Sequence, residues 1–155
     1  VVGLGYPGGP KVDRLALQGE PNIELPKTHF DNLDFSFSGI KTAVINLHHK
    51  NPDINKADLC ASFEKTVTEI LIEHIKKAIE ITGLKTVALA GGVSANSYIR
   101  NAFDGLEKNG IKVYMPDLKL CTDNGAMIGS AGYYNYMAGI RDGLELNAIP
   151  NLKLN

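Results

Sequence analysis

Residues 87–96 read VALAGGVSAN, an apolar run that breaks at Gly91 and Gly92. The run predicts a buried strand that turns into a helix after the glycine pair. Glycines at such a turn allow the backbone to approach a ligand closely, and the amides at the helix start can bind an anion. Residues 121–125, CTDNG, place a carboxylate and an amide at the start of another apolar helix. Together the two turns predict a nucleotide site.

The segments around the first turn alternate between helices and strands. Apolar residues recur at helical spacing and predict the longest helix, from residue 56 to residue 82, which Gly83 is well placed to end. The expected elements that follow are a strand at 85–90, a helix at 94–108, a strand at 111–115 and a helix at 122–139. This order predicts an α/β protein with a parallel strand pair. Ligands of such sheets lie outside the carboxyl ends of the strands, so we expect Gly91 and Asp123 to face one cleft.

The N-terminal part of the chain differs in composition from the rest. It is rich in glycine and proline and predicts one short helix, around residues 12–17. Residues 34–37 predict a strand or an extended segment, and a helix follows to about His48. The expected parts are a ligand loop region at 5–33, an α/β core at 34–140 and a tail at 141–155.

Length and composition are those of an ordinary globular protein. The chain has 155 residues, of which 44% are hydrophobic and 21% charged, enough for one domain with a core. A net charge of −1 gives no global basic field toward nucleic acid, and no apolar stretch is long enough to span a bilayer. Two cysteines, Cys60 and Cys121, favour reduced thiols in a cytoplasmic protein. Because Val1 is not methionine, we expect a piece of a longer protein.

The turn at residues 91–96 has a structural and a functional interpretation. In the structural one, Ser94 is the N-cap of a tight strand-to-helix turn, which alone explains an isolated glycine pair. In the functional one, the Asn96 amide binds a ribose hydroxyl or a base edge while the amides of Gly91 and Gly92 face a phosphate. The presence of the second turn favours the functional interpretation.

Asp123 also has two interpretations. It is either an N-cap carboxylate favoured by the helix dipole or a ligand for Fe, Mn, Mg or Zn. One carboxylate does not hold a metal, and the four histidines form no HxxH or HxxxH pair. The metal site predicted from this chain is therefore incomplete.

The loop YPGGPKVD at residues 6–13 is a third candidate. It is either a structural turn or a ligand loop in which Gly9 gives backbone access and Asp13 accepts hydrogen bonds from sugar hydroxyls. The sequence contains no Ser-His-Asp constellation, Walker loop or CxxC pair, so nucleophilic hydrolysis and P-loop chemistry receive no support.

Four segments resemble one known family. They are YPGGPKVD (6–13), LDFSFSGIKTAV (33–44), ALAGGVSANSYIR (88–100) and PDLKLCTDNGAMIGSAG (116–132). In this order they resemble the carboxy-terminal half of the TsaD family, also called Gcp or YgjD, over roughly residues 1–140. The resemblance implies the ASKHA fold of actin, sugar kinases and Hsp70-type ATPases, in which two ribonuclease-H-like lobes hold a nucleotide. This chain would be the single carboxy-terminal lobe, with parallel strands and packing helices.

The resemblance also implies an activity. Family members are acyltransferases that move a threonylcarbamoyl group from threonylcarbamoyl-AMP to the N6 amine of the adenosine following the anticodon of tRNA. Their protein partners are TsaB and the ATPase TsaE. Gly9, Asp13 and Asn96 match the family's adenylate-binding positions, and the turn at Gly91 and Gly92 would orient the adenylate.

The same resemblance implies one divalent metal, iron in most descriptions and zinc in some, with Asp123 among its ligands. The first lobe, which carries the HxxxH histidines of the family, is absent from this chain. We therefore identify no catalytic residue here and expect neither stoichiometric metal nor activity from the chain alone. The alternatives are a sugar or acetate kinase lobe of the same fold, a metallopeptidase as in the family's old label, and a lobe that only docks partners.

Overall fold

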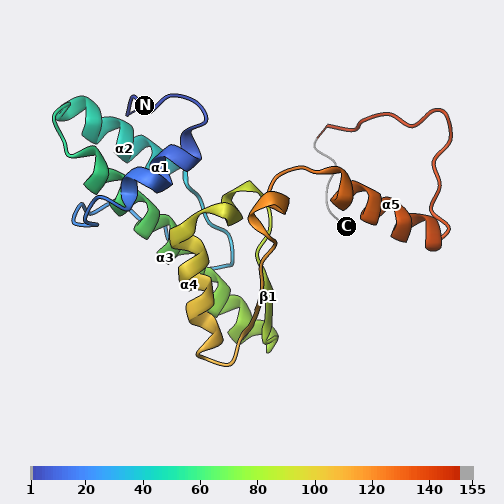
Figure 1. The fold of residues 1–155 in the computed structure, drawn as a ribbon. Helices are drawn as coiled ribbons and strands as arrows, with labels where there is room; N and C mark the ends of the chain where they lie inside the picture. The colour runs from blue at the N-terminus through green and yellow to red at the C-terminus, as the bar shows by residue number, and fades with distance from the viewer. Residues whose placement is uncertain (1, 151–155) are drawn as a thin grey trace. The chain divides into compact units, whose positions relative to one another are not determined.

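The computed structural model describes residues 2–150 (Figure 1). The chain divides into two compact units, the first ending at Cys121 and the second beginning at Thr122. The elements of the first unit are α1 (Gly8–Ala16), α2 (Ser38–Lys50), α3 (Lys56–Thr82), β1 (Thr86–Ala88), the 3₁₀ turn η1 (Gly92–Ala95), α4 (Ser97–Glu107), β2 (Lys112–Tyr114) and the 3₁₀ turn η2 (Leu118–Leu120). The second unit contains α5 (Gly125–Met137). Residues 151–155, the end of the predicted tail, lie outside the described residues.

Helix α3 lies at the centre of the first unit. Asn55 caps its start by accepting hydrogen bonds from the amides of Ala57 and Asp58, and Gly83 ends it with a left-handed φ of 69°. The predicted helix at 56–82 and its glycine stop are therefore confirmed. Apolar side chains of α3 pack into three clusters, one with α1, one with α2, and one with α4 and the strands.

The two strands form a parallel pair, with Val87 opposite Val113. Helix α4 connects them, so the predicted strand-helix-strand unit and its parallel pairing are confirmed. Val87 is buried against Ile99 and Phe103 of α4. The strand predicted at 85–90 is shorter, and its residues Thr86 and Ala88 are exposed, so the prediction of a buried strand was wrong for them. The fold class is α/β, as the alternation of elements predicted.

The two helices that follow the strands begin later in the sequence than predicted, at Ser97 instead of residue 94 and at Gly125 instead of residue 122. Ser94 is not an N-cap, because its amide bonds to the Gly91 carbonyl inside η1 and α4 begins only after Asn96. The side chain of Asn96 accepts the amide hydrogen of Ile99 and is the actual cap. Asp123 does not cap α5 either, because Asn124 accepts the amide hydrogen of Met127.

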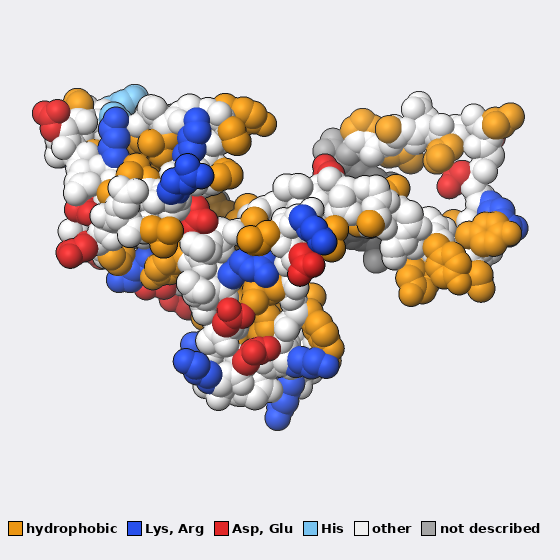
Figure 2. Space-filling view, in the orientation of Figure 1, with side chains coloured by type: hydrophobic (Ala, Val, Ile, Leu, Met, Phe, Trp, Pro, Cys, Tyr) orange, Lys and Arg blue, Asp and Glu red, His pale blue; other side chains and the backbone are white. Residues whose placement is uncertain are grey.

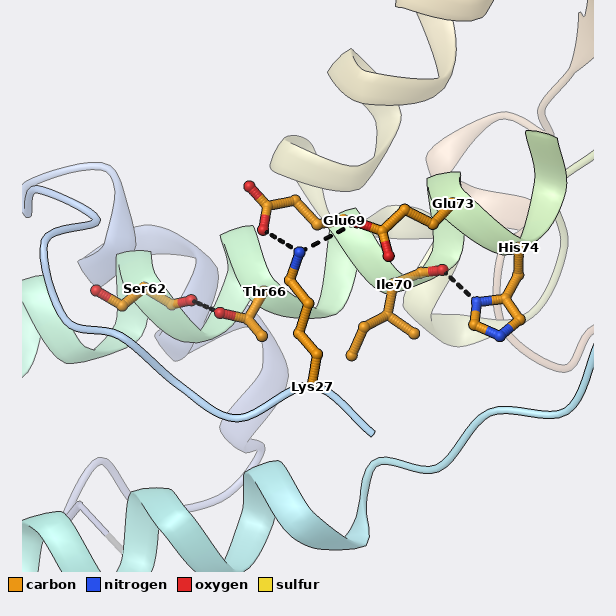
Figure 3. Close-up of polar contacts among 7 residues, drawn as sticks. All are labelled: Lys27, Ser62, Thr66, Glu69, Ile70, Glu73 and His74. Atoms are coloured by element: carbon orange, nitrogen blue, oxygen red, sulfur yellow. Dashed lines mark hydrogen bonds and ion pairs between the residues drawn. The ribbon is translucent and has the colours of Figure 1, made fainter. Parts of the chain in front are cut away.

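The segment between α1 and α2 follows α3 instead of forming a strand. Residues 34–37 pair with no strand; the Phe35 ring packs edge-on against His74 of α3, with ring centroids 5.4 Å apart. Lys27 lies between Glu69 and Glu73 of α3 (Figure 3), and the hydrogen bond that its ammonium donates to Glu69 raises the Lys27 pKa. Further contacts join Glu20 N to Asp58, Ile23 N to Ser62 Oγ, and His74 Nε2 to the Asp34 carbonyl.

Helix α5 of the second unit buries none of its residues. Hydrophobic side chains gather over its C-terminal end in Figure 2. The large exposed ones of this helix are Met127, Ile128, Tyr133, Tyr134, Tyr136 and Met137. None of the described helices combines the length and apolarity needed to cross a membrane.

The contact between Gly19 and α3 provides a test of this packing. A Cβ added at Gly19 would overlap the backbone carbonyl of Ala57 in the first turn of α3. We expect Gly19→Ala to lower the free energy of unfolding by about 1–3 kcal/mol, because backbone cannot yield as a side chain does. Urea denaturation measures the change. The matched control is Gly8→Ala, whose added Cβ meets no atom within 4 Å, and an equal loss in both variants would contradict the prediction.

Candidate functional site

Polar side chains from three helices meet at the start of α4. Asp13 of α1 accepts a hydrogen bond of 2.6 Å from Ser97 Oγ, and its two carboxylate oxygens lie 3.3 and 3.2 Å from the Ser97 amide nitrogen. The first amides of a helix have no partner inside the helix, and they form the positive end of its dipole. The Asp13 carboxylate therefore both satisfies such an amide and is stabilised by it.

Both the oxygen and the nitrogen of the Asn96 side-chain amide form hydrogen bonds. Its Oδ1 accepts the Ile99 amide hydrogen at 2.9 Å, and its Nδ2 donates to Glu64 Oε1 at 2.6 Å. An amide offers an acceptor on one side and two donors on the other, so these two contacts fix its orientation. One N–H of Nδ2 remains for another acceptor.

Glu64 is a buried acidic residue of α3, with only 5% of the residue exposed. Burial raises its pKa to about 6; the hydrogen bond from Asn96 opposes this shift and the nearby charge of Asp13 adds to it. Burial also raises the pKa of the Cys60 thiol one turn earlier, and the Glu64 charge adds to that shift. Sequence reasoning missed Glu64, because a single glutamate in a long helix is usually a solvent-facing residue.

The glycines predicted to face a ligand differ in backbone conformation and in the space around them. Gly91 has φ 87° and ψ 169°, a conformation that only glycine adopts readily. Gly92 begins η1 directly after it. Gly9 lies one helical turn before Asp13 in α1, and a Cβ added there meets no atom within 4 Å. Packing therefore does not require glycine at position 9, and the role of Gly9 toward a ligand stays a prediction.

Arg100 joins the two segments that follow the strands. Its Nη1 donates to the Ser94 carbonyl at 3.0 Å, and its Nη2 donates to the Pro116 carbonyl at 3.1 Å. The turn after β1 and the segment after β2 are thus tied at one edge of the sheet. Nothing in the spacing of the sequence indicated this role of Arg100, because both acceptors are backbone atoms.

Asp123 belongs to the second unit. It is exposed and forms no hydrogen bond or ion pair within residues 2–150. Among those residues, no three His, Cys, Asp or Glu side chains are grouped so that they hold a metal ion. The expected meeting of Asp123 with Gly91 at one cleft stays a prediction, as does its role as a metal ligand.

A separate apolar groove of about 530 Å³ lies among α1, α2 and α3. Its lining includes Val12, Val44 and Phe63, with Lys41 as the charged side chain. Neither Asp13 nor Asn96 belongs to it. The groove is therefore a feature distinct from the polar cluster.

The fold defines this chain as an α/β protein with parallel strands. A crystal structure of HypF from T. kodakarensis shares the fold, with a TM-score of 0.63 and 20% identity over 85% of this chain and 17% of that one. The profile of the TsaD family, described as tRNA N6-adenosine threonylcarbamoyltransferase, matches residues 1–130. The chain belongs to the TsaD family.

Two relatives illustrate the similarity. The tRNA N6-adenosine threonylcarbamoyltransferases of Clostridium novyi and Clostridium perfringens are 49% and 51% identical to this chain. Each alignment covers 99% of this chain and 48% of the relative. The chain thus spans about half the length of the curated relatives it matches.

The raised pKa of Glu64 predicts a pH-dependent stability. Because the folded pKa of about 6 exceeds the ordinary value of 4.5, the folded chain binds the proton more tightly, and stability falls as pH rises through this window. The cost of the buried charge is about 2 kcal/mol. We expect Glu64→Gln to gain about 1–2 kcal/mol relative to wild type between about pH 4 and pH 8. Urea unfolding across this range measures it, and parallel pH profiles would contradict it.

Proposed function

We propose that this chain holds the adenylate part of threonylcarbamoyl-AMP within a tRNA N6-adenosine threonylcarbamoyltransferase. The observation that carries the proposal is the convergence of Asp13, Asn96 and Ser97 at the start of α4, in a chain that belongs to the TsaD family. Asp13 and Asn96 come from motifs 83 positions apart in the sequence, and both end beside the same helix start. Such a convergence of polar groups is typical of a ligand site.

Each residue would have a distinct role toward the adenylate. Carboxylate oxygens have four lone-pair sites, so Asp13 has capacity left for a ribose hydroxyl while it binds Ser97. Asn96 would donate its remaining N–H to the ribose or the base. The backbone at Gly91 and Gly92 would face the phosphate, and the absence of a Cβ at Gly9 would allow the nucleotide to approach α1.

The proposed reaction is acyl transfer to tRNA. The N6 amine of the adenosine after the anticodon attacks the carbamoyl carbonyl carbon and forms the new N–C bond. The bond from that carbon to the phosphate oxygen breaks, AMP leaves with the electron pair, and the amine loses a proton. The chain's residues would bind and orient the adenylate during this step.

Further parts of the proposal follow from the family. We infer the ASKHA fold, with this chain as the second ribonuclease-H-like lobe, in a protein that acts in the cytoplasm. The inferred partners are tRNA and proteins of the TsaB and TsaE kinds. The net charge of −1 gives this chain no overall basic field toward tRNA.

The family resemblance also implies a divalent metal, iron or zinc, with Asp123 as one ligand. The described residues do not fit such a metal by themselves, because no group of three ligating side chains lies together. No step of the transfer is therefore assigned to it. Additional ligands must come from residues other than those described here.

A second candidate function is docking of a partner protein without catalysis. Helix α5 favours it, because the second unit by itself buries none of the residues of this helix and leaves Tyr133, Tyr134 and Tyr136 uncovered near its C-terminal end. The kinase and metallopeptidase alternatives gain nothing from the relatives, which carry the transferase name. Nucleotide binding distinguishes the docking function from the transferase function.

We expect the chain to bind AMP in a calorimetric titration. Asn96→Ser keeps an N-cap oxygen but removes the amide donor, so it should weaken AMP binding about tenfold. It also removes the hydrogen bond to the buried Glu64, which should lower the free energy of unfolding by about 1–3 kcal/mol. Gly9→Ala should also weaken binding, yet retain or raise stability, because alanine favours the helix by up to about 1 kcal/mol. Gly8→Ala is the neighbouring control. Failure of the wild-type chain to bind AMP would favour the docking function.

The isolated chain should hold iron or zinc at well below one equivalent. A lone carboxylate at Asp123 does not outcompete water for these ions. Elemental analysis after incubation with each metal and gel filtration measures the content, with Asp123→Ala as the matched control. One equivalent in the wild type that is lost in the variant would show that this chain has a complete site.

A further inference from the structure

Resting on the proposed function, we propose that Glu64 is a positioning residue of the adenylate site. Its carboxylate holds the Asn96 amide in the orientation that leaves one N–H for the nucleotide. Neither the resemblance of the sequence motifs nor the relatives' names assign any role to this residue. The contact joins the third turn of α3 to the cap of α4, 32 positions apart in the sequence.

The geometry of Asn96 makes its orientation depend on two contacts. The Ile99 amide requires an acceptor and takes Oδ1, whereas Glu64 requires a donor and takes Nδ2. Nδ2 lies 2.6 Å from Oε1, and a hydrogen bond to an ionised acceptor is stronger than one to a neutral acceptor. Without Glu64, the amide would keep its cap bond but lose the contact that directs its nitrogen.

The stability of the folded chain does not explain why position 64 of α3 carries a carboxylate. Glu64 is 5% exposed, and within the described residues no cation forms an ion pair with it. Burying such a group is unfavourable, and an apolar side chain on this face of α3 would avoid the cost. Costly buried charges with a polar partner occur preferentially at functional sites.

The two carboxylates near the cap have separate partners. Asp13 approaches from α1 and binds Ser97, while Glu64 approaches from α3 and binds Asn96. The charged or titratable groups that interact with Glu64 are Asp13 across the helix interface and Cys60 on its own helix. A variant that changes only Glu64 leaves both in place, so it isolates the effect of this carboxylate.

Adenosine is the best probe for the test. A phosphate monoester titrates near pH 6, where Glu64 also titrates, and AMP would therefore mix two ionisations. Adenosine carries the ribose and the base but no phosphate. Its dissociation constant is measured for the 155-residue chain and its variants at a series of values from about pH 5 to about pH 8.

In wild type, the affinity for adenosine should rise several-fold as pH increases through about 6, because ionised Glu64 is the stronger acceptor for Asn96. Glu64→Gln retains an oxygen acceptor without the charge, so its affinity should vary much less with pH. Glu64→Leu removes the acceptor and should weaken binding about tenfold at the upper end of the range. The side-chain amide signals of Asn96 in ¹⁵N spectra should titrate in wild type and stay fixed in the Gln variant.

Identical pH profiles for wild type and Glu64→Gln would overturn the proposal, even if the Leu variant does not fold. A folded Leu variant with wild-type affinity, or Asn96 signals that do not respond to pH, would overturn it as well. In these cases the wild type still binds adenosine, so the proposed function stands. Absence of adenosine binding by the wild type rejects the adenylate site itself, and the role of Glu64 with it.

Discussion

Helix α3 has to bury side chains on several faces, and this requirement organises the first unit. Apolar side chains along this helix of 27 residues belong to three clusters, one formed with α1, one with α2, and one with α4 and the strands. A helix that is apolar on more than one side is stable in water only when other elements cover it. The segment from Glu20 to Asp34 adds polar contacts along the same helix. The positions of α1 and α4 are therefore consequences of how α3 is covered.

The candidate site follows from this packing. Because α1 packs against the first turns of α3, Asp13 reaches the start of α4, and because α4 packs further along, Asn96 meets Glu64. The positive end of the α4 dipole lies beside two carboxylates, of which Asp13 contacts a backbone amide directly. Glu64 accepts a hydrogen bond from the side chain of Asn96, and burial raises the Glu64 pKa. One helix start thus has two acidic groups with different hydrogen-bond partners beside it, Asp13 with Ser97 and Glu64 with Asn96.

Local patterns predicted much of the fold. The periodicity of residues 56–82 and the glycine at position 83 predicted α3, and the alternation of elements predicted the parallel strands. The helix starts were predicted less well, since Ser94 and Asn96 are both good N-caps, as are Asp123 and Asn124. Asn96 is the N-cap of α4, because the chain forms a 3₁₀ turn directly after Gly91 and the Ser94 amide donates its hydrogen bond within that turn. Of the strand or extended segment predicted at residues 34–37, the strand did not form, and Phe35 packs on His74.

The sequence by itself determined the type of each long element, the glycine turn after β1 and, through its motifs, membership of the TsaD family. It also pointed to Gly9, Asp13 and Asn96 as residues of one site. Only the tertiary structure decided which polar groups meet, Glu64 with Asn96 and Arg100 with the backbone carbonyls after the two strands. The physical reason is that periodicity and turn chemistry act over a few residues, whereas these contacts depend on how helices far apart in the sequence pack. A glutamate on a long helix has the same local pattern whether it faces water or the cap of another helix.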